Sequence, residues 1–130
     1  MFTRVHHVGL VVGDIDAAKK LWLDTYGFRV DEARSPLPHG RHVALDDVNI
    51  LDIPVGESEL EVNKANDPNS GTGRFLARRG AGPHHLCLYS DDIEADVKRL
   101  KDAGQQIIMG PLGSSGQNGG SRVAAFANLP

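Results

Sequence analysis

Residues 6–15 read HHVGLVVGDI, and residues 84–93 read HHLCLYSDDI. Each stretch begins with a doubled histidine, continues as an apolar segment and reaches Asp-Ile, which places His7 and His85 at matching positions. The apolar segments are rich in aliphatic and β-branched residues, which is typical of strands. A duplicated unit that repeats an imidazole at one strand position suggests a ligand set built across a pseudo-twofold axis. We therefore expect two copies of one structural unit and test the hypothesis that they bind a metal.

The composition indicates an ordinary globular protein. A chain of 130 residues is one domain or two small fused modules, and 40% hydrophobic with 24% charged residues is typical of soluble proteins. The formal net charge of −3 does not provide the positive charge that attracts nucleic acid or an anionic membrane. No segment has the length of an apolar membrane span, and the N-terminus lacks a signal peptide pattern. With a single cysteine, we expect a cytoplasmic protein that binds neither nucleic acid nor membrane.

The first copy, residues 1–66, predicts the element order β-α-β-β-β. A strand is expected over residues 5–12, and Asp14 can cap the helix that follows. The apolar positions of this helix recur with a period near 3.6; they are Ile15, Ala18, Leu21, Trp22 and Tyr26. The other strands are expected at Phe28–Ala33, within Val43–Ile53 and at Glu57–Asn63, with a proline-containing loop over Ser35–Gly40.

The second copy, residues 83–130, repeats the pattern after a linker over residues 67–82 that contains a short helix around Arg74–Arg79. Asp92 can cap its helix, which ends at Gly104. Its strands are expected at His84–Tyr89, Gln105–Met109 and Arg122–Asn128, with a Gly/Ser-rich loop over Pro111–Gly120. The sequence ends before a further strand pattern, so we expect the second module to lack its last strand.

The matched histidines are candidate metal ligands. Strand alternation places His7 on one face of the first strand and His85 on the corresponding face of its repeat, so paired modules would bring the imidazoles together. The last strand of the first module offers further oxygen ligands on one face: Glu57, Glu59, Glu61 and Asn63. Two neutral imidazoles and a carboxylate suit Mn, Co, Ni, Fe or Zn and leave positions open for substrate.

A structural interpretation of the histidines also stays open, because a strand histidine is more often a packed or surface residue than a ligand. His6 and His84 point away from their neighbours, so structural or supporting roles suit them better. His39 and His42 lie near the proline-rich loop and are expected to be solvated. Cys87 is most simply a small buried apolar residue.

These residues resemble the vicinal oxygen chelate superfamily, which includes glyoxalase I, extradiol dioxygenases, antibiotic-resistance proteins and methylmalonyl-CoA epimerase. The sequence is most similar to the epimerase branch, and the resemblance covers nearly the whole chain. Residues 75–86, FLARRGAGPHHL, are its most specific segment. The other matching segments are His7–Val12 with Asp14-Ile15, Leu60–Val62, Asp92-Ile93 and Leu100–Gly104.

The resemblance implies an α+β fold in which two paired βαβββ modules form a curved mixed sheet around a metal site. It also implies that His7, Glu61 and His85 bind a divalent metal ion, whose identity among Co, Mn, Ni, Zn and Fe stays open. In such enzymes the metal chelates two oxygens of the substrate and stabilises an enolate as a proton leaves the carbon between them.

Two positions depart from the family pattern. The family's fourth ligand is a glutamate on the last strand of the second module, where this sequence has no counterpart; truncation, another chain or water are the alternatives. The epimerase also carries an acid/base glutamate three residues after a glycine that corresponds to Gly40, and Val43 stands there instead. His42 would reach the inner face after a one-residue register slip and is our candidate for the catalytic proton transfer. Asp46 and Asp47 are further candidates, although surface turn residues are the simpler interpretation.

The resulting hypothesis is a metal-dependent epimerase or isomerase of the methylmalonyl-CoA epimerase type, acting on a small acyl substrate that can be a CoA thioester. Arg74, Arg78 and Arg79 could receive a CoA ester, or they could form an exposed helix face. The alternatives are a glyoxalase-like lyase, an extradiol-type dioxygenase, or a non-catalytic resistance-type protein that binds a small molecule. An unpaired edge strand in the second module, together with the resemblance, favours a homodimer.

Overall fold

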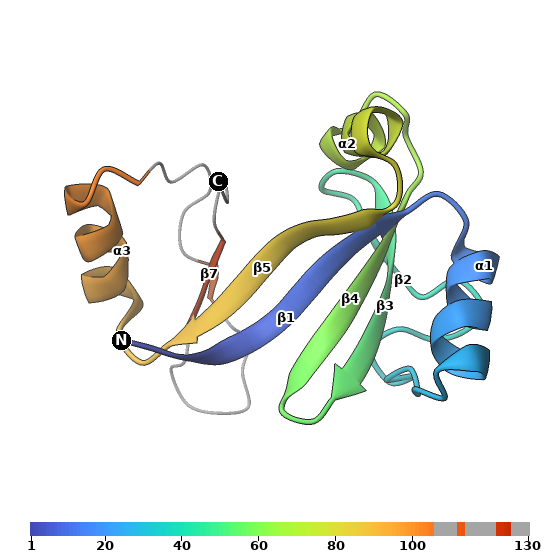
Figure 1. The fold of residues 1–130 in the computed structure, drawn as a ribbon, viewed down its shortest axis with the longest axis horizontal. Coiled ribbons are helices and arrows are strands. Elements are labelled where there is room, and N and C mark those ends of the chain that lie inside the picture. The colour runs from blue at the N-terminus through green and yellow to red at the C-terminus, as the bar shows by residue number, and fades with distance from the viewer. Residues whose placement is uncertain (106–111, 114–121, 126–130) are drawn as a thin grey trace. The chain divides into compact units, whose positions relative to one another are not determined.

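The computed structural model describes residues 1–105, 112–113 and 122–125. The chain divides into a central unit, residues 8–84, and a terminal unit, residues 1–7 with 85–130. The elements in chain order are β1 (Phe2–Val12), α1 (Ile15–Lys19), η1 (Lys20–Thr25), β2 (Arg41–Val43), β3 (Val48–Val55), β4 (Ser58–Ala65), α2 (Gly71–Arg79), β5 (Gly82–Ser90), α3 (Ile93–Asp102), β6 (Leu112–Gly113) and β7 (Arg122–Ala125) (Figure 1). Both β1 and β5 pass from one unit into the other, and each unit is described by itself.

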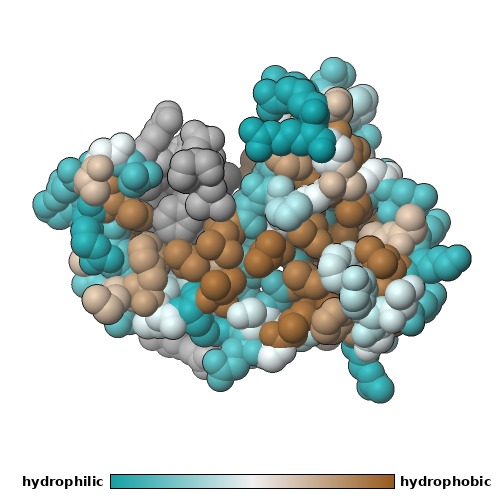
Figure 2. Space-filling model, viewed as in Figure 1, coloured by the Kyte–Doolittle hydropathy of each residue, from teal (hydrophilic) through white to brown (hydrophobic). Residues whose placement is uncertain are grey.

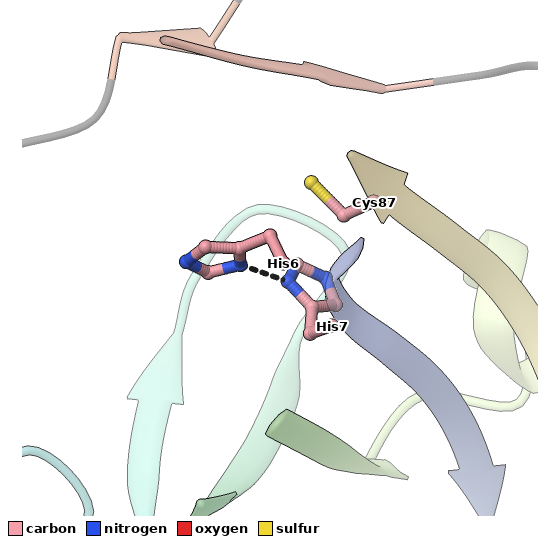
Figure 3. A group of neighbouring side chains, drawn as sticks. All are labelled: His6, His7 and Cys87. Atoms are coloured by element: carbon pink, nitrogen blue, oxygen red, sulfur yellow. Dashed lines mark hydrogen bonds between the residues drawn. The ribbon is translucent and has the colours of Figure 1, made fainter. Parts of the chain in front are cut away.

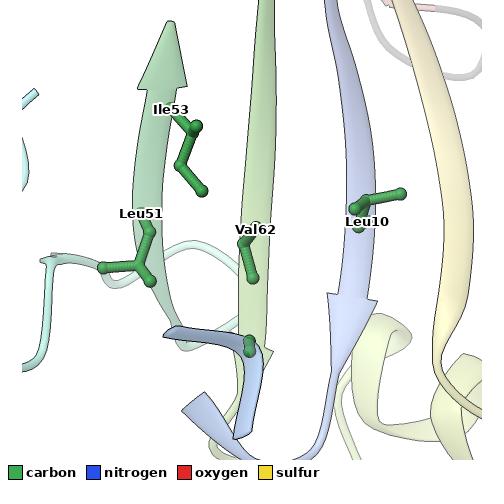
Figure 4. Close-up of a cluster of buried hydrophobic side chains, with 5 residues drawn as sticks. Leu10, Leu51, Ile53 and Val62 are labelled. Atoms are coloured by element: carbon green, nitrogen blue, oxygen red, sulfur yellow. The ribbon is translucent and has the colours of Figure 1, made fainter. Parts of the chain in front are cut away.

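The sheet of the central unit has the strand order β2-β3-β4-β1. Strand β3 pairs antiparallel with β2 and with β4, and Leu51 lies opposite Val62 in the second pairing. One face of this sheet carries the apolar core, shown in Figure 4: Leu10, Ala18, Leu51, Ile53 and Val62. Because side chains alternate along a strand, the opposite face is free to carry polar groups.

The first helix begins as the sequence predicts. The carboxylate of Asp14 accepts hydrogen bonds from the backbone N–H groups of Asp16 and Ala17, at 2.9 and 3.1 Å. After Lys19 the α-helix widens into the π-helix η1. The wider turn changes the period, and Tyr26 at its end is exposed and stacks on Trp22 rather than entering the core.

The strand expected at Phe28–Ala33 is absent, and this prediction was wrong. Phe28 and Val30 pack against the core, as their apolar character indicated, but from an irregular segment. The carboxylate of Asp31 accepts a hydrogen bond from the guanidinium of Arg34 at 2.7 Å, and its carbonyl accepts one from the N–H of Ser35. These local bonds form turns that compete with strand pairing. Strand β2 takes the second place in the element order, which remains β-α-β-β-β.

Helix α2 lies inside the stretch predicted as a linker. Ser70 caps it by accepting a hydrogen bond from the N–H of Gly73 at 3.0 Å. A Cβ on Gly73 would lie 2.1 Å from the carbonyl oxygen of Asp67, so only glycine permits this close approach at the helix start. The module boundaries at residues 66 and 83 stay a prediction.

In the terminal unit the strand order is β1-β5-β7-β6, and β5 pairs antiparallel with β7. Asp92 caps α3 through the N–H of Ala95, as predicted. Ile93 and Val97 are buried and pack with Phe2. A strand was expected at Gln105–Met109, but residues 106–109 lie outside the described residues. Strand β6 falls within the stretch expected to be a loop.

A buried carboxylate ties α3 to β5. Asp96 accepts a hydrogen bond from the hydroxyl of Ser90 at 2.5 Å and another from the guanidinium of Arg99. Burial raises the pKa of Asp96, but the hydrogen bonds that the carboxylate accepts lower the pKa below its usual range. The end of β5 is therefore anchored by an ionised group.

The predicted α+β class is confirmed by these elements. Among the residues that the structure describes, no helix has the length and apolar character needed to cross a membrane.

Candidate metal centre

His7 and His85 lie side by side in the terminal unit, on the neighbouring strands β1 and β5. Their Nε2 atoms are 3.0 Å apart, and the two rings meet edge to face with centroids separated by 5.1 Å. The His7 side chain is buried, with 9% of its surface exposed. The structure thus brings together the two imidazoles that the repeat singled out.

His6 contacts the other nitrogen of the His7 ring. The two Nδ1 atoms are 2.7 Å apart, and His6 also meets the ring of Tyr89 edge to face. A single proton shared between these nitrogens satisfies both, because a neutral imidazole has one donor and one acceptor. When His7 donates that proton, its Nε2 atom carries a lone pair on the side of His85. Strand alternation had predicted that His6 points away, so this contact was missed.

The spacing of the His7 and His85 nitrogens fits a shared metal ion. Imidazole nitrogens bind divalent transition metals at about 2.1 Å, and two such ligands at a right angle are roughly 3.0 Å apart. The observed separation of 3.0 Å is close to this value, and it is equally the length of a hydrogen bond in which one ring's Nε2–H donates to the other Nε2. Metal-bound histidines almost always donate their second ring N–H to a neighbouring acceptor, and the Nδ1 atom of His6 is placed to accept from His7.

A second group of potential ligands shares His7. The ligand atoms of His6, His7 and Cys87 all lie within 4.8 Å of one another, and Figure 3 shows the thiol of β5 near the two rings of β1. Cys87 is buried, as predicted. A thiolate with two imidazoles would select a softer ion than two imidazoles with a carboxylate. A Cys87 variant would therefore lose the metal if His6, His7 and Cys87 are the ligands, and would keep it if Cys87 is not a ligand.

Glu61 lies on β4 in the central unit, opposite Asp52 of β3. This cross-strand pair lies on the sheet face opposite the apolar core, because Leu51 and Val62 occupy the alternate positions. The Oε1 atom of Glu61 accepts a hydrogen bond from the amide of Asn63 at 3.3 Å, and Oε2 lies 3.7 Å from Nη2 of Arg41.

Two more ionised residues support this face, and the sequence analysis missed both. Asp52 is 1% exposed and accepts hydrogen bonds from Nε and Nη2 of Arg41 at 2.7 and 3.1 Å. The bonds to Asp52 raise the pKa of Arg41, which stays a cation beside Glu61. An aspartate within a strand of apolar residues was the available signal, since buried charges require partners.

Glu59, another of the candidate carboxylates, is engaged elsewhere. It pairs with the guanidinium of Arg34, which also binds Asp31. Glu57 is exposed, in the turn before β4. Of these glutamates, Glu61 is the one that lies directly opposite Asp52 and 3.7 Å from Nη2 of Arg41.

His42 lies on β2 opposite Asn49, whereas Arg41 lies opposite Ile50. The register slip considered above is therefore absent, and His42 faces away from Arg41 and Glu61. Its Nε2 atom is 2.7 Å from Oδ1 of Asp47, and this bond lowers the pKa of Asp47. The catalytic assignment of His42 stays a prediction, and this geometry does not favour it.

Asp46 caps the N-terminus of helix α2, and this role does not involve proton transfer to a substrate. Its carboxylate accepts hydrogen bonds from the N–H groups of Gly71 and Thr72, at 2.7 and 3.0 Å, at the N-terminus of α2. Partial burial lowers the pKa of His84, and the negative charge of Asp46 opposes that shift. The sequence-based interpretation of Asp46 as a turn residue agrees with its positive φ of 66°.

Comparisons with known proteins agree with this fold. The family model described as the Glyoxalase/Bleomycin resistance protein/Dioxygenase superfamily matches residues 6–125. The chain is 29% identical over 109 residues to the ethylmalonyl-CoA/methylmalonyl-CoA epimerase of Cereibacter sphaeroides, covering 83% of this chain and 76% of the relative. It is 32% identical over 100 residues to the mitochondrial methylmalonyl-CoA epimerase of Mus musculus, covering 75% of this chain and 52% of the relative.

A solved methylmalonyl-CoA epimerase in complex with methylmalonyl-CoA and NH4+ is similar in structure, with a TM-score of 0.70 and 25% identity. The match covers 95% of this chain and 84% of that one. This chain belongs to the glyoxalase/bleomycin resistance protein/dioxygenase superfamily. It spans about half the length of the mouse relative that it matches.

Proposed function

We propose that this chain is a metal-dependent epimerase or isomerase that transfers a proton at the carbon next to an acyl thioester carbonyl. His7, Glu61 and His85 are the proposed ligands of one divalent cation. The observation that carries the proposal is the pair of Nε2 atoms 3.0 Å apart. The similarity to methylmalonyl-CoA epimerases over most of the chain supports the reaction class.

Glu61 enters the proposal through its place on β4, the neighbour of β1 in the central unit. His7 is the last residue of β1 in the terminal unit, and Val8 is the first in the central unit. In the central unit β1 neighbours β4, and Asn63 of β4 donates a hydrogen bond to the carbonyl of Leu10 at 3.2 Å. Within the central unit, β4 is therefore held beside β1.

Each of these residues has a distinct proposed role. The bound cation would polarise the thioester carbonyl and stabilise an enolate. In this proposal Nδ1 of His6 accepts the Nδ1 proton of His7, so that the Nε2 lone pair of His7 is available to the cation. Arg41 and Asn63 orient the carboxylate of Glu61, through a charge at 3.7 Å and a hydrogen bond at 3.3 Å. Arg41 is itself fixed by the buried Asp52.

Val43 favours a second candidate function. Inversion of a carbon needs a base on one face and an acid on the other, and Val43 occupies the position where the resemblance places one of these groups. By register, Val43 shares a sheet face with Arg41. A protein that binds the small acyl ligand without turnover would have no need of a proton-transfer group there.

The test is deuterium exchange at the α-carbon of methylmalonyl-CoA, followed by NMR with the metal-loaded protein in D2O. The epimerase predicts exchange that depends on the cation and is lost in His85→Ala. Substrate binding without exchange, with the cation bound, would reject the epimerase in favour of the binding protein. Oxygen consumption with catechols would instead indicate the dioxygenase alternative. A homodimer and a cytoplasmic location stay predictions.

A further inference from the structure

Helix α2 exposes one face that is lined by small and basic residues. Gly71, Arg74, Ala77 and Arg78 are all exposed and line an open hollow of about 470 Å³. Their spacing of three and four residues places them on one side of the helix. Figure 2 shows hydrophilic residues gathered over α2, at the top of the view. Because Gly71 and Ala77 have little or no side chain, the two arginines flank open space.

The charges of this face are not neutralised by the rest of the described chain. Among residues 1–105, 112–113 and 122–125, neither Arg74 nor Arg78 makes an ion pair with an acidic group. Two like charges one helical turn apart repel each other. The pair therefore contributes nothing to the stability of α2 in the absence of an anion.

Two neighbouring features distinguish this face from the rest of the helix. The first N–H groups of α2 are already occupied, because Asp46 accepts from Gly71 and Thr72. An anion therefore has to bind to the arginines rather than to the helix N-terminus. Arg79 differs from the pair, since its guanidinium lies over the ring of Phe75, 5.7 Å from the centroid.

We propose that the Arg74–Arg78 face binds the phosphate groups of a coenzyme A thioester. This inference rests on the proposed function, whose substrate class it makes specific. Guanidinium groups bind phosphate oxygens in a bidentate manner. The volume of the open hollow, about 470 Å³, lies within the usual range for small-molecule pockets, about 300–1,000 Å³. A diphosphate with a neighbouring phosphate ester presents several such groups, whereas a simple acyl ester presents none.

The experiment compares Arg74→Gln, Arg78→Gln and the Arg74→Gln/Arg78→Gln double variant with Arg79→Gln, which removes one charge from the same helix and so matches each single variant. Isothermal titration calorimetry measures the binding of coenzyme A, dephospho-coenzyme A and inorganic pyrophosphate. We expect the double variant to weaken coenzyme A binding by about 10–100-fold, as for the loss of one or two charge-assisted contacts. Arg79→Gln should change the affinity by less than about twofold, because its guanidinium lies over the Phe75 ring and does not line the hollow.

Equal coenzyme A affinity in the wild type and the double variant would overturn the inference. An equal loss in Arg79→Gln would overturn it too, because it would show a general effect of net charge. Binding of pyrophosphate without binding of coenzyme A would identify free polyphosphate as the ligand and reject a thioester site. Weaker binding of dephospho-coenzyme A supports contact with the ribose phosphate.

The deuterium exchange assay separates this inference from the proposed function. Arginine-dependent coenzyme A binding without α-carbon exchange would leave the phosphate site standing and reject the epimerase. Exchange by the double variant with an unchanged KM for the thioester would leave the epimerase standing and reject the phosphate site.

Discussion

Replacement of His6 tests whether the His7 ring is held in a metal-binding tautomer. His6→Phe keeps an aromatic ring beside Tyr89 but removes the nitrogen that lies 2.7 Å from Nδ1 of His7. The variant removes this acceptor for the Nδ1 proton of His7, and the proton can then move to Nε2, where it blocks coordination. Loss of such a supporting contact costs about 10–100-fold in metal affinity, or roughly 1.4–2.7 kcal/mol.

The assay is a titration of the metal-free protein with Co²⁺ against a competing chelator, followed by absorbance. His6→Asn offers a carboxamide oxygen as acceptor and should recover most of the lost affinity. Thermal unfolding of the three proteins without metal controls for damage to the fold. A Co²⁺ affinity of His6→Phe within twofold of the wild type would refute the role assigned to His6.

Three further variants probe the rest of the site and its support. Cys87→Ser should keep the metal, and a loss of metal would show that His6, His7 and Cys87 form the true site. His42→Ala should keep α-carbon exchange within about threefold, because the side chain faces away from Glu61; a loss beyond a hundredfold would make His42 catalytic. Asp96→Asn should lower the free energy of unfolding at pH 7 by about 1–3 kcal/mol. The pKa of Asp96 is lowered from 3.8, so urea titrations should show this difference shrinking as the pH falls below 3.8, and a pH-independent difference would contradict the buried ion pair.

The order of the elements in the first module was predictable because period and capping agree there. Asp14 and the apolar spacing after it define the helix start, and alternating apolar residues define β3 and β4. The segment from residue 28 to 33 has the composition of a strand but forms turns. Its conformation is determined by hydrogen bonds between Asp31 and nearby residues. The amino-acid composition of the segment does not reveal these bonds.

The pairing of His7 and His85 was predictable because the two residues occupy the same position in the two copies of the internal repeat. The contact between His6 and His7 was not, since alternation along an ideal strand separates neighbouring side chains. The group of Arg41, Asp52 and Glu61 depends on the register of three strands, which a single sequence does not specify. Asp52 alone carried a hint, as a charged residue in a strand of apolar residues.

Metal content tests the central claim most directly. Purified wild type, His85→Ala, Glu61→Ala and the adjacent control His84→Ala would be dialysed against one divalent cation and measured by elemental analysis. The account predicts about one ion per chain in the wild type and in His84→Ala, as expected for a single mononuclear site. The ion should be absent from His85→Ala and Glu61→Ala, with circular dichroism unchanged. The same stoichiometry in all four proteins would contradict the assignment of His7, Glu61 and His85 as the ligands.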